Sequence, residues 1–288
     1  MTKDRKKEKL NLSKRVWEID FMRGLAILLV AFDHALFDMA YLFGEAWTSS
    51  NNIGLIKAQD FAYSFDVSAL KDFWWPFFII LFFIVSGIST SFSRNNFKRG
   101  LKLAMVAVLL TVGSVFLEDY VGISGITIYF GVLHCIAASI LIITLIDAIL
   151  NKIPKMNRIL KALIFWVLGI LIVLFYNSNF SPIGSGTLES TIQTDNLFLG
   201  IFIHVEAFWR LTADYFPLVP YIGYFSLGTA IGLILYSNKQ SLIPKLNGAW
   251  HLPITIPGRH SAFIYLGVRA IDIAILALIT YIITGSFL

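Results

Sequence analysis

One apolar stretch near the start of the chain, residues 15–38, carries several ionisable side chains, among them Arg23, His34 and Asp38. On an α-helix these three residues fall along one stripe, and Asp38 lies one turn beyond His34. A carboxylate one turn from an imidazole can hold its tautomer and raise its basicity, as a general base requires. The spacing therefore predicts proton-transfer chemistry at His34 and Asp38. The alternative is a histidine that only ties neighbouring helices together.

Arg23 is a candidate for binding an anionic or amide-bearing group. It precedes His34 by eleven positions, which is roughly 16 Å along a helix at about 1.5 Å per residue. Arg23 is therefore too far away to join the same proton transfer directly. The alternative is an ion pair with Asp20, three residues earlier, combined with snorkelling of the side chain toward the membrane surface.

A second histidine, His134, lies in another apolar stretch and at a depth expected to resemble that of His34. It is either part of the same catalytic site or a polar tie between helices. Near the predicted outer surface of the membrane, carboxylates and an arginine flank aromatic residues. This combination suits a sugar, but an ordinary solvated loop would look the same. These substrate-binding candidates are Glu206, Arg210 and Asp214.

The composition places the chain in the polytopic membrane class. Hydrophobic residues make up 57% of it, charged residues 14%, and the mean hydropathy is +0.74. The pI near 9.2 does not indicate a nucleic-acid partner, because the positive charge is distributed in short segments between apolar runs. The single cysteine, Cys135, excludes a disulfide framework, and no metal-ligand spacing stands out.

The pattern of apolar runs predicts an all-α bundle of about seven transmembrane helices. A shorter run, 197–208, cannot cross a hydrocarbon core of about 30 Å and is expected to form an interfacial or re-entrant helix. Residues 44–71 and 177–196 are expected to be polar loops. The predicted spans are 20–42, 72–93, 101–116, 126–150, 160–176, 218–236 and 261–287.

Most Lys and Arg residues lie in an N-terminal tail, 1–18, and in the segments 94–102, 152–161 and 239–259. Seven spans with a cytoplasmic N-terminus place all of these segments on the inner side, as the positive-inside rule requires. We therefore expect a tail that contacts anionic lipid and a domain over residues 19–288 that crosses the plasma (inner) membrane several times. Positive-inside charge also explains Arg94 and Arg99 more simply than a phosphorylated ligand does.

Several segments resemble a known family. IDFMRGLAILLVAFDH resembles the first helix of the transmembrane acyltransferase superfamily, marked by an arginine, ten residues and a histidine, here Arg23 and His34. DFWWPFFIILFFIVSGIS, YFGVLHCIA, DYFPLVPYIGYFSLGTAIG and GRHSAFIYL resemble the branch that contains the heparan-alpha-glucosaminide N-acetyltransferase catalytic domain. The resemblance covers nearly the whole chain after the tail.

This resemblance implies a membrane enzyme that takes an acyl group, usually acetyl, from acetyl-CoA in the cytoplasm and passes it to a sugar or glycan amine or hydroxyl on the far side. It implies that His34 is the catalytic or acyl-handling histidine, that Arg23 is on the donor side, and that His134 and Asp214 are family positions. The arginines expected to bind the donor are Arg23, Arg94, Arg99, Arg259 and Arg269.

The chain departs from its relatives in two places. The eukaryotic heparan enzyme uses a histidine in the first outer loop, and this chain has none between His34 and His134, so glucosamine specificity and an acyl-histidine on that loop are not implied. Many relatives also have a histidine after Ile-Tyr-Leu, where this chain continues Gly267, Val268, Arg269. Arg269 would either assist donor binding or mark a loss of activity.

The leading hypothesis is a seven-helix acyltransferase with His34 as general base or transient acyl carrier and Asp38 as its orienting partner. One alternative is a proton-coupled small-solute transporter that uses the buried His, Asp and Arg side chains as a relay. Another is a catalytically inactive relative that acts as a binding or assembly subunit. Because several relatives self-associate, a homodimer is also suggested.

Overall fold

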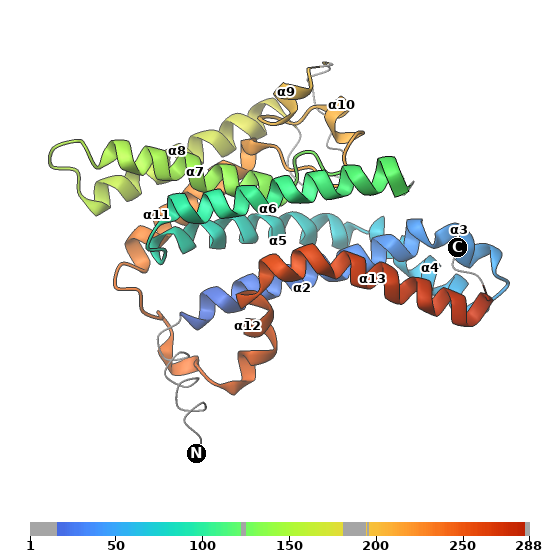
Figure 1. The fold of residues 1–288 in the computed structure, drawn as a ribbon. Helices are drawn as coiled ribbons and strands as arrows, with labels where there is room; N and C mark the ends of the chain where they lie inside the picture. Colours follow the sequence, from blue (N-terminus) through green and yellow to red (C-terminus); the bar gives the residue numbers. More distant parts are fainter. Residues whose placement is uncertain (1–15, 122–124, 181–193, 195, 286–288) are drawn as a thin grey trace. The chain divides into compact units, whose positions relative to one another are not determined.

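The computed structural model describes residues 16–121, 125–180, 194 and 196–285. Within these residues, seven helices are long and apolar enough to cross a membrane. The prediction of an all-α, polytopic membrane fold is thus confirmed. The spanning helices are α2 (Trp17–Phe37), which continues into the π-helical segment η1 (Asp38–Leu42), α5 (Ala69–Ile88), α6 (Asn96–Phe116), α7 (Val132–Leu150), α8 (Arg158–Asn179), α11 (Leu218–Leu235) and α13 (Ser261–Thr284) (Figure 1).

The chain forms two compact units. The first contains the residues up to Phe82 and those from Ile243 onward, and the second is Phe83–Leu242. The first unit therefore combines α2 with the C-terminal helices α12 (Leu252–Arg259) and α13, which are far from it in sequence. The second unit contains α6, α7, α8 and α11.

In the first unit, α12 packs directly on the start of α2 because two glycines face the opposite backbone. A Cβ atom on Gly24 would lie 1.8 Å from the carbonyl oxygen of Ile254, and one on Gly258 would lie 1.8 Å from that of Asp20. Any side chain at either glycine would force the two helices apart. This contact keeps α12 on the face of α2 that carries Asp20.

In the second unit, neighbouring helices are tied by hydrogen bonds that would be costly to leave unmade inside a membrane. The Ser226 hydroxyl on α11 donates to the Phe165 carbonyl on α8 at 2.8 Å. Residues before α7 pair with a distant segment, where Phe130 forms an isolated parallel bridge with Tyr215. These contacts bring the N-terminal end of α7 next to residues 212–216.

The predicted polar loop over 44–71 is wrong, because the structure has two helices there, α3 (Gly44–Ser49) and α4 (Ile53–Asp66). The Asn52 side chain caps α4 by accepting hydrogen bonds from the backbone N–H groups of Gly54 and Leu55. Leu55 and Ala62 are buried. Tertiary burial of these few apolar positions stabilises the helix. The polar residues between them made the segment look like a loop in the sequence.

Three further boundaries differ from the prediction. Residues 126–131 are not helical, because the Glu118 carboxylate accepts the N–H groups of Ile126 and Thr127 and α7 begins only at Val132. The expected connection 237–260 contains the helix α12. The run 197–208 forms two single turns, α9 (Leu197–Gly200) and α10 (Glu206–Trp209), and not one helix.

One phenol side chain, that of Tyr215, contacts the backbone polar groups at the break between α9 and α10. The Tyr215 hydroxyl lies 2.7 Å from the Gly200 carbonyl oxygen and 2.9 Å from that of Ile203, and it accepts the N–H of Val205. Burial raises the pKa of Tyr215 to about 12, so the hydroxyl keeps its proton for these bonds. In a continuous helix these backbone groups would pair with one another and would not need the Tyr215 hydroxyl.

Candidate functional site

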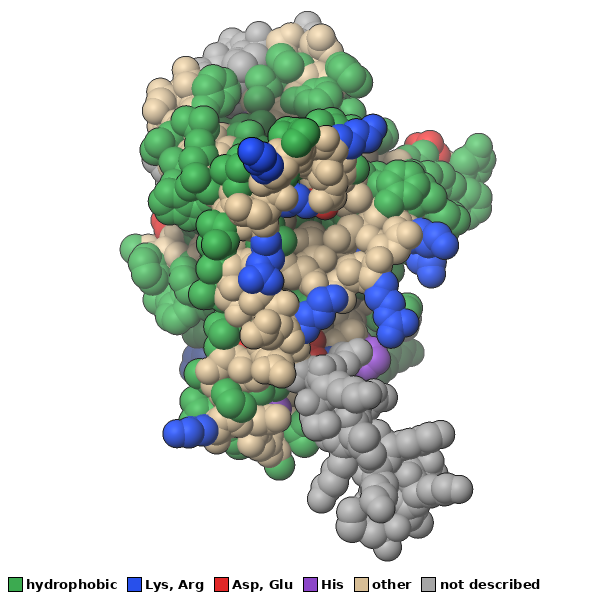
Figure 2. Space-filling model, turned by 90° about the vertical axis from the view of Figure 1, so that its left-hand side faces the viewer, with side chains coloured by type: hydrophobic (Ala, Val, Ile, Leu, Met, Phe, Trp, Pro, Cys, Tyr) green, Lys and Arg blue, Asp and Glu red, His purple; other side chains and the backbone are tan. Residues whose placement is uncertain are grey.

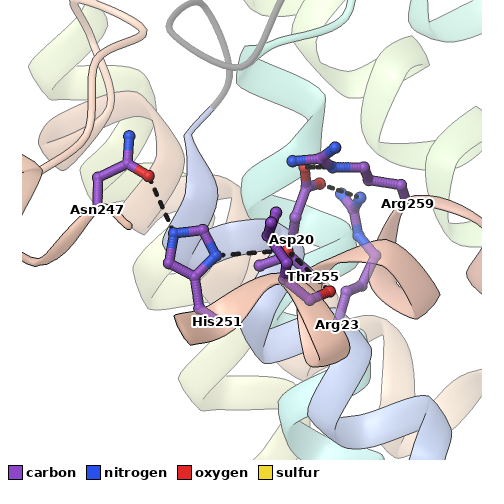
Figure 3. A network of polar contacts seen from close by, with 7 residues as sticks. Asp20, Arg23, Asn247, His251, Thr255 and Arg259 are labelled. Carbon is purple, nitrogen blue, oxygen red and sulfur yellow. Dashed lines mark hydrogen bonds and ion pairs between the residues drawn. The ribbon is translucent and has the colours of Figure 1, made fainter. Parts of the chain in front are cut away.

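At the start of α2, two arginines share one carboxylate (Figure 3). An Arg23 nitrogen, Nη1, lies 3.5 Å from Asp20 Oδ1, and Arg259 Nε lies 3.3 Å from Asp20 Oδ2. The Asp20 side chain is only 10% exposed. Two guanidinium groups thus lie close together at a partly desolvated position, and guanidinium groups are suited to binding carboxylate and phosphate oxygens. The predicted pair between Arg23 and Asp20 is present, and Arg259 joins it.

The close approach of α12 to α2 explains why Arg259 reaches Asp20. Arg259 is the last residue of α12 and follows Gly258, whose Cα faces the Asp20 carbonyl. The sequence predicted both arginines as donor-binding residues, but the structure supplies the reason for grouping them. We call Asp20, Arg23 and Arg259 the arginine cluster.

His251, which no sequence motif marks, supports the same region from the turn before α12. It is 2% exposed, and its ring stacks on Trp17 with centroids 4.5 Å apart and planes 13° apart. Its Nε2 lies 2.9 Å from Asn247 Oδ1, and its Nδ1 lies 3.4 Å from Thr255 Oγ1 (Figure 3). Spacings of four residues on either side were the only sequence signal for this network.

The electrostatic environment of His251 favours its neutral form. Burial lowers the pKa of His251 below its usual value of 6.5, and the positive charge of Arg259 lowers it further. A neutral imidazole between Trp17 and Thr255 fits a role in holding α12 on α2. His251 is therefore part of the scaffold around the arginine cluster.

The predicted catalytic pair lies at the other end of α2. His34 is half-buried in the last turn of α2, and Asp38 is completely buried at the first position of η1. The Asp38 backbone N–H donates to the carbonyls of His34 and Ala35, so the two residues are separated by one helical turn, as predicted. The helix then widens to a π-turn, a feature that is frequent at functional sites.

His134 lies in the second unit, where both of its ring nitrogens have partners. The Gly131 N–H donates to His134 Nδ1 at 3.2 Å, and Nε2 lies 3.0 Å from Thr111 Oγ1. The Thr111 hydroxyl donates its own proton to the Ile128 carbonyl at 2.7 Å, so it accepts from His134. This pattern requires a neutral ring protonated at Nε2, and it favours the role of a polar tie between α6 and α7.

The predicted acceptor-side residues separate into two groups. Asp214 Oδ2 accepts the N–H of Val132 at 3.0 Å and caps α7, and a Cβ on Gly131 would lie 2.0 Å from the same oxygen. Glu206 and Arg210 form a salt bridge with each other at α10 and are largely exposed. Asp214 is thus next to the turn that holds His134, whereas Glu206 and Arg210 form a surface pair.

Residues 15–269 match the family model described as heparan-alpha-glucosaminide N-acetyltransferase, catalytic. The chain belongs to this family. The match includes every spanning helix except the last part of α13. No curated protein and no solved structure gives a significant match.

Membership of this acetyltransferase family, together with seven apolar helices, indicates a membrane acetyltransferase. The remaining arginines predicted to bind its donor lie outside the arginine cluster. Arg94 is exposed before α6, and Arg99 Nη2 lies 3.5 Å from the Ser86 carbonyl, both in the second unit. The side chain of Arg269 lies outside the described residues. Figure 2 shows exposed Lys and Arg side chains in blue.

Proposed function

We propose that this acetyltransferase takes the acetyl group from acetyl-CoA on the cytoplasmic side and transfers it to a sugar or glycan amine or hydroxyl on the opposite side. One observation carries the proposal. In a family member, the membrane-spanning helix α2 contributes Asp20 and Arg23 to the arginine cluster at its start, and it carries His34 in its last turn, one turn before Asp38. The proposed location is the plasma (inner) membrane, with the N-terminus in the cytoplasm, in a protein that forms a homodimer.

The arginine cluster would receive the phosphates of the donor. Arg23 and Arg259 both pair with Asp20, and their side chains are 22% and 20% exposed. Their partial exposure leaves them able to contact a ligand, and a guanidinium binds phosphate oxygens in a bidentate manner. Arg94, Arg99 and Arg269 are additional candidates for the same donor.

His34 would carry out the transfer at the far end of α2. As a general base, its imidazole removes the proton from the acceptor amine or hydroxyl while that nitrogen or oxygen attacks the thioester carbonyl carbon. The carbon–sulfur bond then breaks, and coenzyme A leaves as a thiol after taking up a proton. Alternatively, a His34 ring nitrogen first attacks the thioester carbon and coenzyme A leaves as its thiol; the acceptor then attacks the acetyl carbon, the bond from that carbon to the ring nitrogen breaks, and the acceptor proton passes to the ring. In both routes Asp38 orients the ring.

The residues proposed to bind the acceptor are those at α10. Glu206 and Arg210 are polar and exposed there, and Trp209 beside them is 52% exposed, a combination that suits a sugar ring and its hydroxyls. Asp214 would act less directly, by fixing the start of α7. The family match gives no support to the transporter hypothesis.

The test is acetyl-CoA binding and coenzyme A release by detergent-purified protein, with glucosamine as the acceptor probe. We expect His34→Ala to bind acetyl-CoA but to lose turnover by at least about 100-fold, as is typical for removing a general acid–base group. Arg23→Ala should instead weaken donor binding. Lys57→Ala, on the exposed side of α4, is the matched control and should behave like wild type. Wild-type protein that neither binds acetyl-CoA nor releases coenzyme A would contradict the proposal.

The same assay separates the two histidines. His134→Ala removes a cap and a tie between helices and should lower thermal stability, while the folded fraction keeps its turnover. If His134→Ala protein loses turnover while its thermal stability is unchanged, His134 has a catalytic role and is not only a tie between helices.

A further inference from the structure

Four side chains of the first unit form an ionic clasp near the end of α2. The Lys71 ammonium, at the start of α5, lies 3.4 Å from Asp33 Oδ1 on α2 and also pairs with Asp66 at the end of α4. The Tyr41 hydroxyl in η1 donates to Asp66 Oδ2 at 2.7 Å. Asp33 immediately precedes His34 in sequence. The clasp therefore joins α2, η1, α4 and α5 through the residue next to the proposed catalytic histidine.

Apolar packing beneath the clasp holds α4 against the same part of the chain. Leu36 on α2, Ala40 in η1 and Ala62 on α4 form a buried cluster. Gln59 Nε2 on α4 also donates to the Ala40 carbonyl at 3.3 Å. This bond gives a side-chain partner to a carbonyl within the π-turn, which contains Asp38. The conformation of η1 thus depends on contacts from α4.

The charges of the clasp are substantially shielded from solvent. The side chains of Lys71, Asp33 and Asp66 are 18%, 19% and 15% exposed. One ammonium serves two carboxylates at these positions, so its removal leaves two partly buried negative charges facing each other. Such a change is far more disruptive than the loss of an exposed surface pair.

We propose that Lys71 is a positioning residue for the His34–Asp38 pair. Its ammonium holds the end of α4 on Asp33, and α4 in turn supports the π-turn that begins at Asp38. The ring of His34 and the carboxylate of Asp38 therefore keep their relative orientation only while the clasp is closed. The inference rests on the proposed function of His34, but the clasp itself is a feature of the fold.

The kinetic test compares Lys71→Ala, Lys71→Arg and the exposed control Lys57→Ala in the coenzyme A release assay. We expect Lys71→Ala to lower kcat by roughly 10- to 100-fold, because a misplacement of about 1 Å can cost that much. The KM for acetyl-CoA should stay within about twofold, since Lys71 contacts α2 at Asp33, well beyond Arg23 along the helix. Lys71→Arg keeps the charge and should restore most of kcat.

A second readout does not depend on activity. Diethyl pyrocarbonate modifies accessible neutral histidines, and peptide mass spectrometry gives the rate for His34 and for the exposed His260 separately. We expect Lys71→Ala to change the rate at His34 and not that at His260. If Lys71→Ala does not fold, Asp33→Asn, which preserves the side-chain shape, takes its place and should act in the same direction.

An unchanged kcat in folded Lys71→Ala protein, or an unchanged His34 modification rate, would overturn the positioning role. A fall in kcat that Lys71→Arg does not restore would also overturn it. If wild-type protein releases no coenzyme A, the proposed function fails, and the His34 modification rate alone then decides whether the clasp controls this histidine.

Discussion

Ionisable residues near the ends of α2 are compensated by partners, and the partners indicate what each residue does. Asp20 is held between Arg23 and Arg259. Asp33 is held by Lys71, which Asp66 shares, so that negative charge is in excess there. Unpaired charges at membrane depth are costly and are retained where they have a function. The two guanidinium groups at one end of the helix fit an anionic donor, and the carboxylates near the other end fit a base.

His251 provides a pH-dependent test at the level of one residue. Burial and the Arg259 charge lower its pKa in the folded protein below 6.5, so the unfolded chain binds a proton more readily as the pH falls through that value. The contribution of His251 to stability is therefore complete above about pH 6.5 and decreases below it, by at most about 1.4 kcal/mol per pH unit.

We predict that the thermal midpoint of wild-type protein falls between pH 7.5 and pH 5.5 more steeply than that of His251→Gln, measured by intrinsic fluorescence. His260→Gln, at an exposed position beside α12, is the control and should keep the wild-type slope. Equal slopes for wild type and His251→Gln would show that protonation of His251 is not coupled to folding.

At the level of elements, α2 serves as the axis of the first unit. The helix α12 contacts its start through Gly24 and Gly258, whereas α4 contacts its end through the buried cluster around Ala62. Both α12 and α4 lie in stretches that read as connections in the sequence. The helix α12 brings Arg259 to Asp20 of α2. The helix α4 brings Asp66 to Lys71 of α5, which also pairs with Asp33 of α2.

The glycine contact predicts the effect of one added methyl group. Gly258→Ala would place its Cβ 1.8 Å from the Asp20 carbonyl oxygen, so α12 must move away and withdraw Arg259 from Asp20. We expect a loss of stability of about 1–3 kcal/mol and weaker acetyl-CoA binding. Gly267→Ala on α13, whose Cβ would meet its nearest atom at 4.0 Å, is the control and should be neutral or slightly stabilising. Wild-type donor affinity in Gly258→Ala would argue against Arg259 as a donor contact.

At the level of the whole molecule, the distribution of basic residues predicts the orientation in the membrane. The turn between α7 and α8 contains Lys152 and is expected to face the cytoplasm, whereas the turn between α3 and α4 is expected outside. The single native cysteine, Cys135, is fully buried. The wild-type chain is therefore a suitable background for introduced cysteines.

We predict that Ser49→Cys reacts with a membrane-impermeant maleimide in right-side-out vesicles and that Lys152→Cys reacts in inside-out vesicles. Both positions are exposed. Wild-type protein should remain unlabelled in both preparations. The reverse pattern would invert the topology and place the arginine cluster on the side away from cytoplasmic acetyl-CoA.

The sequence by itself determined the features that depend on local composition. Runs of apolar residues long enough to cross a bilayer identify the seven spans, because the membrane imposes both length and hydrophobicity on each helix separately. The one-turn spacing of His34 and Asp38 and the distance from Arg23 follow from helix geometry alone. The family resemblance rested on the same local segments and is confirmed over residues 15–269.

Only the tertiary structure decided the features that depend on contacts between distant segments. Arg259 reaches Asp20 across 239 positions of sequence, and His134 is occupied by Thr111 of another helix. The helix α4 was missed because its few buried apolar residues gain their stability from packing on η1, which no local pattern records. The charge balance and the helix contacts at the ends of α2 depend on residues that are close in space but distant in sequence. For that reason the arginine cluster, the His251 network and the ionic clasp emerge only from the folded chain.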